Sequence, residues 1–220
     1  MSEKALTVGA FGARGTGKTA WMTQQIEKAR PPRLLIWDYK DDPPIAHLGQ
    51  PVHSMAELAR LARHGPRDKF KLRYVVDQSG KGQSIAAQFE WFCRIAYESG
   101  NLLMYVAELP EVTAANKAPQ AWRRCVNVGR LYKLRGEIKT LAIFADGQRF
   151  AEVDKSFLNN CDVLHCGRGN NLADAKLMGD TLGVNYRDLL ALPDLHWIEK
   201  RAGVMAPQRG ILKFTKKVPR

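Results

Sequence analysis

The chain has 220 residues, of which 45% are hydrophobic and 25% are charged, a composition typical of a folded globular domain and not of a disordered or fibrous chain. Its 34 lysines and arginines outnumber its 22 aspartates and glutamates, which gives a formal net charge of +12 and favours an acidic polymer, meaning nucleic acid, as partner. No apolar run approaches the roughly 20 residues that cross a bilayer, and the N-terminus lacks the layout of a signal peptide, so we expect a soluble intracellular protein.

Apolar periodicity and turn residues predict strands that alternate with helices along the chain. The strands are expected at residues 5–12, 33–39, 71–77, 102–109, 140–146 and 162–167. The helices are expected at residues 18–30, 55–65, 85–100, 119–135, 150–160 and 171–183. Ser54 and Ser84 are suited to cap the second and third helices, which end at Gly65 and Gly100. The tail, residues 195–220, has the alternating pattern of a β-hairpin.

This alternation is typical of βαβ units. We predict one α/β domain over residues 1–220, with a mainly parallel sheet covered by helices on both faces and a β-hairpin extension at 195–220. The four cysteines show no CxxC spacing, and reduced thiols are expected. A metal cluster that includes His165 and Cys166 is the alternative.

A phosphate-binding loop is predicted between the first strand and the first helix. Residues 12–19, GARGTGKT, match G-x-x-x-x-G-K-[ST] in the strand–loop–helix context that supports the pattern. The glycines let successive backbone N–H groups point into one concavity, and the helix adds the positive end of its dipole. We therefore expect ATP and Mg²⁺, with Lys18 on the β- and γ-phosphates and the Thr19 hydroxyl on the metal. The predicted nucleotide-binding residues are Gly12, Ala13, Arg14, Gly15, Thr16, Gly17, Lys18, Thr19 and Ala20.

The fourth predicted strand ends in an acidic residue, Glu108. A carboxylate at this edge of a parallel sheet can orient the water that attacks the γ-phosphate, and a solvated surface charge is the alternative. An Asp-Glu pair is usual there, but Ala107 stands where the Mg²⁺-associated Asp is expected. Asp38, at the end of the second strand, is the first candidate to compensate as a metal neighbour, and Glu111 is a weaker one.

Over most of its length the chain resembles the FtsK/HerA superfamily of P-loop motor ATPases, which pump DNA through hexameric rings. The resemblance rests on the P-loop, the segment LLIWDYKDD, the strand that ends in Glu108, and residues 127–179. It implies a RecA-like core. It also implies that Gln148, in a Gln-Arg pair after a strand, senses the γ-phosphate, because an amide both donates and accepts hydrogen bonds. A loop amide without that role is the alternative.

Among such motors, a basic chain without further domains is similar to the genome-packaging ATPases of membrane-containing icosahedral viruses. This resemblance implies a homo-oligomeric ring, with a hexamer favoured, that moves double-stranded DNA. It places the protein in the host cytoplasm or the virion, with viral portal-vertex or membrane proteins as further partners. Assembly ATPases of filamentous phages, of the zonula occludens toxin type, are similar but carry a transmembrane segment that this sequence lacks.

Ring motors place an arginine of one subunit against the neighbour's γ-phosphate. The candidates are Arg124, Arg130, Arg135, Arg149 and Arg168, of which Arg130 and Arg149 best match the family's segment. For each of them, a surface or DNA-facing arginine is the alternative. DNA contacts are expected from Lys117, Arg123 and Arg124, which follow the catalytic strand, and a solvated loop is an equal alternative.

Two kinds of function stay open at this point. The first is an ATP-driven translocase of double-stranded DNA. The second is a nucleotide-dependent DNA-binding or scaffolding module with little turnover, because Ala107 replaces an expected carboxylate. A small-molecule kinase is a weaker third possibility, since the sequence has no arginine-rich lid segment.

Overall fold

The strands form one large sheet and one separate two-stranded sheet in the computed structural model of the chain, which describes residues 5–63 and 69–214. The strands are β1 (Thr7–Phe11), β2 (Arg33–Asp38), β3 (Gln50–Val52), β4 (Phe70–Val75), β5 (Leu102–Val106), β6 (Tyr132–Leu134), β7 (Glu137–Lys139), β8 (Leu141–Gly147), β9 (Val163–Cys166), β10 (His196–Arg201) and β11 (Gln208–Ile211). The α-helices are α1 (Lys18–Ala29), α2 (Met55–Ala62), α3 (Ile85–Ser99), α4 (Gln120–Val128), α5 (Lys155–Asn160), α6 (Leu172–Leu182) and α7 (Tyr186–Leu190). Three 3₁₀ helices complete the set: η1 (Pro43–Leu48), η2 (Leu109–Glu111) and η3 (Phe150–Glu152).

The order of the strands brings three of their ends together. The nine-stranded sheet has the order β11-β10-β9-β1-β8-β5-β2-β4-β3. β1 lies between β8 and β9 and is parallel to both, and β8 separates β1 from β5. The carboxyl ends of β1, β8 and β5 therefore lie side by side at one edge of the sheet, which is where open α/β sheets bind ligands.

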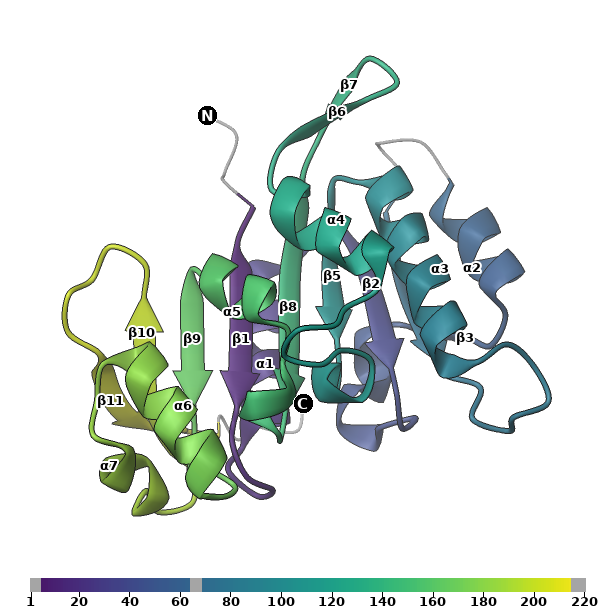
Figure 1. Cartoon of the computed structure of the whole chain (residues 1–220). Helices are drawn as coiled ribbons and strands as arrows, with labels where there is room; N and C mark the ends of the chain where they lie inside the picture. The colour runs from purple at the N-terminus through teal and green to yellow at the C-terminus, as the bar shows by residue number, and fades with distance from the viewer. Residues whose placement is uncertain (1–4, 64–68, 215–220) are drawn as a thin grey trace, which may run out of the picture.

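Helices cover both faces of this sheet, as predicted (Figure 1). One face packs against α2 to α6, through large buried side chains such as Trp37, Phe92 and Trp122. The other face packs against α1 and η1, through Met22 and Ile26 of α1 among others. Full burial of such side chains contributes about 1.5–3 kcal/mol each. The two cores fix the sheet between them and hold the carboxyl edge in place.

The predicted α/β class and parallel sheet are confirmed, but one predicted helix is wrong in part. The helix expected at 119–135 ends at Val128, and residues 132–139 form the β6–β7 hairpin instead. Arg135 and Gly136 form its turn and have φ of 50° and 87°. Positive φ at both central residues is what a common kind of two-residue hairpin turn requires. The sequence signal for this hairpin is the alternating stretch YKLRGEIK with an Arg-Gly turn, which the predicted helix does not take into account.

The C-terminal hairpin is present, and it extends the main sheet. β10 pairs antiparallel with β9, and β11 pairs antiparallel with β10. Among the described residues, the short elements β3, α7, η1 and η2 were also not predicted. Gly65, the expected end of the second helix, and residues 215–220 of the expected hairpin lie outside the described residues.

Candidate nucleotide-binding site

The loop between β1 and α1 has the backbone shape of a phosphate cradle. Gly12, Gly15 and Gly17 have φ of 148°, 82° and 86°, values that L side chains rarely adopt. The loop is fixed to β9 because the Ala13 N–H donates to the carbonyl of Arg168 at 2.7 Å. In the described chain no side chain caps the start of α1, so its first N–H groups stay available to a ligand.

Lys18 is held over this loop. Its Nζ donates to the carbonyl of Ala13 at 2.9 Å, and the Thr16 hydroxyl donates to the same oxygen at 2.9 Å. Burial lowers the pKa of Lys18, an effect that the carboxylates of Asp146 and Glu108 partly oppose. The ammonium group is therefore poorly hydrated beside the loop, and phosphate oxygens are partners that suit it.

A cleft of about 760 Å³ opens beside the loop. Its walls come from the loop and α1, from η1, from the ends of β5 and β8, and from the C-terminal hairpin. The lining residues are Arg14, Gly15, Gly17, Lys18, Thr19, Ala20, Thr23, Gln24, Glu27, Pro44, His47, Glu108, Asp146, Gln148, Leu195 and Phe214. The sequence predicted eight of these residues. Six belong to the loop and the start of α1, namely Arg14, Gly15, Gly17, Lys18, Thr19 and Ala20, and the other two are Glu108 and Gln148. Gly12, Ala13 and Thr16, also predicted, belong to the same loop but do not line the cleft.

Glu108 and Gln148 meet at the phosphate end of the cleft. Gln148 Nε2 donates to Glu108 Oε1 at 3.1 Å, and Lys40 Nζ forms an ion pair with the same oxygen at 2.7 Å. Glu108 lies between the end of β5 and η2, and its backbone is left-handed, with φ of 56°. The two residues that the sequence assigned to water and phosphate are therefore in direct contact.

Asp146, at the end of β8, is a member of the site that sequence reasoning missed. Its side chain lines the cleft, and the whole residue is 4% exposed. Tyr105 Oη donates to Asp146 Oδ2 at 2.9 Å, and the Glu108 N–H donates to Oδ1 at 3.0 Å. Burial, reinforced by the Glu108 carboxylate, raises the pKa of Asp146 to about 6. The signal was in the sequence, because TLAIFAD is an apolar run that ends in an acid, as LLMYVAE does.

Asp38, predicted as a metal neighbour, is placed differently. Its buried carboxylate accepts from Arg73 Nη1 and from the N–H groups of Lys40 and Asp42, at 3.2 and 3.0 Å for the latter two. It is not among the residues that line the cleft. Asp38 therefore supports the loop after β2 and is not positioned as a metal neighbour.

Two of the predicted arginines, Arg149 and Arg168, lie near the site at the carboxyl edge of the sheet. Arg149 follows Gln148 and forms an ion pair with Glu152 at 2.9 Å. Arg168 follows β9 and forms an ion pair with Asp194 at 3.0 Å.

The other candidate arginines lie elsewhere. Arg130 forms an ion pair at 2.8 Å with Asp162, whose carboxylate also accepts from the N–H of Thr7 at the start of β1. This places Arg130 at the amino edge of the sheet, opposite the cleft. Arg124 stacks on the ring of a tyrosine of α3 at 4.3 Å, and Arg135 forms an ion pair with a glutamate of α3 at 3.0 Å.

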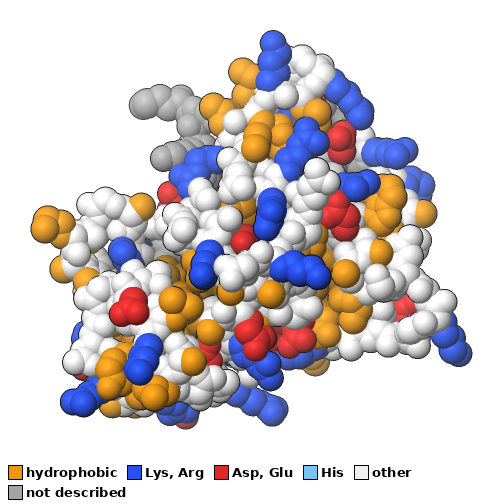
Figure 2. Space-filling model, in the orientation of Figure 1, with side chains coloured by type: hydrophobic (Ala, Val, Ile, Leu, Met, Phe, Trp, Pro, Cys, Tyr) orange, Lys and Arg blue, Asp and Glu red, His pale blue; other side chains and the backbone are white. Residues whose placement is uncertain are grey.

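The residues expected to contact DNA are exposed. Lys117 lies in the loop before α4, and Arg123 and Arg124 lie on α4 itself. Lys and Arg side chains are spread over this face of the molecule, including the region of α4 and the β6–β7 hairpin (Figure 2). The positive charge on this face suits a polyanion, and it is spread out instead of forming one narrow band.

Part of the wall of the cleft is apolar. Leu195 and Phe214, from the C-terminal hairpin, line it together with Gln24 of α1. Gln24 Nε2 donates to the carbonyl of Lys213 at 2.9 Å, which ties the hairpin to α1. An apolar wall beside a phosphate cradle is suited to a nucleotide base.

The donors at the phosphate end suit a hydrated Mg²⁺ ion. Thr19 and Asp146 both line the cleft and have side-chain oxygen atoms of the kind that Mg²⁺ prefers. Mg²⁺ in nucleotide sites takes one or two protein oxygens and completes its shell with phosphates and water. A dense cluster is not needed, and the part of the chain that the structure describes contains no group of three or more His, Cys, Asp or Glu arranged to hold a metal.

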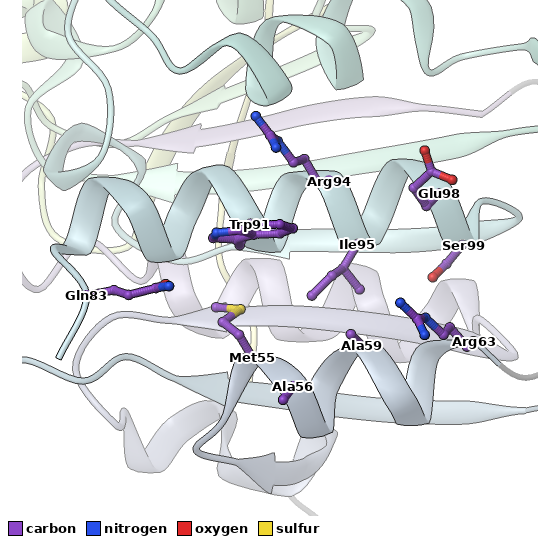
Figure 3. Close-up of a pocket in the computed structure, with 10 residues that line it drawn as sticks. All are labelled: Met55, Ala56, Ala59, Arg63, Gln83, Trp91, Arg94, Ile95, Glu98 and Ser99. Carbon is purple, nitrogen blue, oxygen red and sulfur yellow. The ribbon is translucent and has the colours of Figure 1, made fainter.

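A second pocket, of about 330 Å³, lies between α2 and α3 (Figure 3). Met55 and Ala59 of α2 and Trp91 and Ile95 of α3 contribute to its mainly apolar lining. It contains no part of the phosphate-binding loop, so the nucleotide is assigned to the cleft beside α1.

Comparisons with known proteins agree with this assignment at the level of the fold. No protein-family model matches the sequence. Protein P9 of Pseudoalteromonas phage PM2 is 24% identical to the chain over 188 residues, which cover 84% of this chain and 78% of that protein. The genome packaging NTPase B204 of Sulfolobus turreted icosahedral virus 2, solved in complex with sulfate, superposes with a TM-score of 0.70 at 12% identity, covering 97% of this chain and 100% of that one.

The same viral NTPase, solved in complex with AMPPCP, superposes with a TM-score of 0.68. The bacterial conjugative coupling protein TrwBdeltaN70 has a TM-score of 0.62 at 10% identity, covering 98% of this chain and 90% of that one. The chain therefore has the fold of the viral packaging NTPase and of the conjugative coupling protein, which confirms at that level the resemblance predicted from the sequence. None of the described helices is long and apolar enough to span a membrane.

Proposed function

We propose that the chain is an ATP-hydrolysing motor of the FtsK/HerA superfamily that moves double-stranded DNA into a viral particle. The observation that carries this proposal is the meeting of Lys18, Glu108 and Gln148 in one cleft beside a glycine-rich loop. The likeness to the packaging NTPase B204 and the net charge of +12 support DNA as the polymer.

In this proposal the phosphates of ATP bind the N–H groups of the loop and of the first turn of α1. Lys18 exchanges the carbonyl of Ala13, its present partner at 2.9 Å, for phosphate oxygens. Thr19 would hold Mg²⁺, which when bound would supply charge neutralisation for the transferred phosphoryl group. The adenine lies against the apolar part of the wall, at Leu195 and Phe214.

Hydrolysis then depends on the pair at the end of β5 and β8. The Glu108 carboxylate accepts a hydrogen bond from the attacking water and orients it. Gln148, which already donates to Glu108 at 3.1 Å, can hold the γ-phosphate and the carboxylate in one network. Lys40 Nζ forms an ion pair with the same oxygen of Glu108 at 2.7 Å, so this ion pair must loosen before that oxygen accepts a hydrogen bond from the attacking water.

A ring of subunits, with a hexamer favoured, completes the proposed motor. Arg149 and Arg168 lie at the carboxyl edge, which makes them better placed than Arg130 to act on a neighbour's phosphate across a ring contact. Lys117, Arg123 and Arg124 are the proposed DNA contacts, and the virion or the host cytoplasm is the proposed location. Portal-vertex or membrane proteins of the virus are the proposed docking partners, and residues 1–220 act as one domain.

The test measures ATP hydrolysis with and without duplex DNA while light scattering follows oligomer size. We expect DNA to stimulate turnover of the wild-type chain, and both Lys18→Ala and Glu108→Gln to abolish it. Lys28→Ala is the matched control, because Lys28 is an exposed lysine in the last turn of the same helix. Lys117→Ala/Arg123→Ala is expected to reduce the DNA stimulation and the salt dependence of DNA binding while basal turnover persists.

A second function is favoured by the Lys40–Glu108 ion pair and by Ala107, both of which point to slow hydrolysis. In that case the chain is a nucleotide-dependent DNA-binding or scaffolding module. Association with DNA that responds to ATP, with negligible turnover at any DNA concentration, would support this module and contradict the motor.

A further inference from the structure

The site has a buried carboxylate directly beside the position where one is missing. Val106 of β5 is in register with Ala145 of β8, so the next residues along the two parallel strands, Ala107 and Asp146, lie across from each other. Ala10 of β1 is in register with Asp146 on the other side. Asp146 therefore lies between the strand that leads into the phosphate-binding loop and the strand that ends in Glu108.

Asp146 and Ala107 also share a face of the sheet. Tyr105 of β5, Ala107 directly after that strand and Phe144 of β8 belong to the core cluster on the α1 side. Side chains along a strand alternate between faces, so Asp146, two residues after Phe144, points to the same side. This is the side on which Lys18 and Thr19 line the cleft.

The carboxylate is oriented and keeps room for another partner. Tyr105 occupies one oxygen at 2.9 Å and the Glu108 N–H occupies the other at 3.0 Å. An ionised carboxylate has about four acceptor positions, so each oxygen retains capacity toward the cleft. A buried negative charge is costly unless it is compensated, and a cation in the cleft is suitable compensation.

We propose that Asp146 takes the part of the acid that position 107 lacks, and binds the Mg²⁺ of Mg²⁺·ATP, directly or through a water of its shell, together with Thr19. The inference rests on the proposed function, because it presupposes that the cleft binds ATP. It differs from the prediction made for Asp38, whose carboxylate faces Arg73 and lies outside the cleft. The proposed metal-binding carboxylate therefore lies at the end of β8 and not at the end of β5, at the same edge of the sheet.

The test is a binding measurement. Calorimetric titration with AMPPCP, a nucleotide that is not turned over, gives the affinity with Mg²⁺ and with EDTA, and the ratio is the Mg²⁺-dependent gain. We expect Asp146→Asn to reduce that gain by about 10–100-fold, as loss of a residue that supports a metal typically does, and to leave the affinity in EDTA unchanged or improved. Glu57→Gln is the matched control, because this exposed acid in the first turn of α2 lies outside the cleft.

A relocation variant guards against an effect of folding alone. Ala107→Asp in the Asp146→Asn background restores a carboxylate on the same face, and we expect it to recover the Mg²⁺-dependent gain. An unchanged gain in Asp146→Asn would overturn the inference. Asp146→Asn alone could also lose all nucleotide binding, even in EDTA. In that case the double variant decides: a restored Mg²⁺-dependent gain in Ala107→Asp/Asp146→Asn supports the inference, and no restored gain overturns it. A wild-type chain that binds no nucleotide under either condition would instead overturn the proposed function.

Discussion

Replacing Gly17 with alanine is predicted to disturb the contact between the phosphate-binding loop and the C-terminal hairpin. Gly17 has φ of 86°, and a Cβ at this position would lie 2.6 Å from Leu212 Cδ2 and 3.1 Å from Leu195 Cδ2. A left-handed backbone costs an alanine about 1–2 kcal/mol. Forcing a methyl group into a packed contact costs about 1–3 kcal/mol more. We therefore expect Gly17→Ala to lower the free energy of unfolding by about 2–5 kcal/mol.

Gly15→Ala separates the two contributions. Gly15 has φ of 82°, but nothing lies within 4 Å of a Cβ built there, so only the backbone cost of about 1–2 kcal/mol is expected. Urea unfolding of wild type, Gly15→Ala, Gly17→Ala, Leu212→Ala and the Gly17→Ala/Leu212→Ala double variant measures each change in free energy. In the double variant, Leu212→Ala should cost less than it does alone, because it removes the overlap. The reasoning is refuted if Gly17→Ala costs no more than Gly15→Ala, or if the costs of Gly17→Ala and Leu212→Ala simply add.

Three further predictions concern the surroundings of the cleft. Asp38→Asn is expected to destabilise the fold by about 1–3 kcal/mol, since it removes one of the two carboxylates that pair with Arg73 and leaves Asp41 as the other. It is expected to keep the Mg²⁺-dependent gain in nucleotide affinity; urea unfolding and calorimetry measure the two effects. Burial lowers the pKa of His165 below 6.5 despite its contact with Glu199 at 3.1 Å. The unfolded chain therefore binds more protons than the folded chain, and the stability contributed by neutral His165 is lost as pH falls below about 6.5. His165→Gln should flatten this part of the pH profile of the urea midpoint. Phe214→Ala is expected to weaken ATP binding about tenfold and leave the affinity for tripolyphosphate unchanged, because base stacking on an aromatic ring contributes about 1–3 kcal/mol; equal losses for both ligands would show that Phe214 does not contact the base.

Much of the fold was predictable because its signals are local. Each strand next to the site is an apolar run that ends in a residue of distinct chemistry, and the loop at residues 12–19 combines glycine, lysine and threonine in one short stretch. Glu108 was predicted in this way because it ends an apolar run, whereas Gln148 was implied by the resemblance to the motor ATPases, and the contact between the two at 3.1 Å was not predicted. A pattern of this kind fixes which edge of the sheet a residue occupies.

What local patterns do not give is the order of strands and the partners of each side chain. That β8 lies between β1 and β5 depends on pairing across more than a hundred residues, and only this order makes Asp146 a neighbour of Ala107. Asp38 appeared free to reach the cleft because its partner, Arg73, lies on the adjacent strand β4. The hairpin at 132–139 was missed because its first strand and the first residue of its turn were assigned to the end of the helix predicted at 119–135.

The connection between Asp146 and Glu108 decides how the site should be tested. Asp146 Oδ1 accepts from the Glu108 N–H at 3.0 Å, and Glu108 has a left-handed backbone that costs a non-glycine residue about 1–2 kcal/mol. A change at Asp146 therefore alters both the proposed metal contact and the position of the carboxylate that orients water. Loss of turnover in Asp146→Asn is expected from either cause and cannot distinguish them. The Mg²⁺-dependent gain in nucleotide affinity depends on the first cause alone, because a displaced Glu108 affects hydrolysis without adding or removing a metal contact at Asp146.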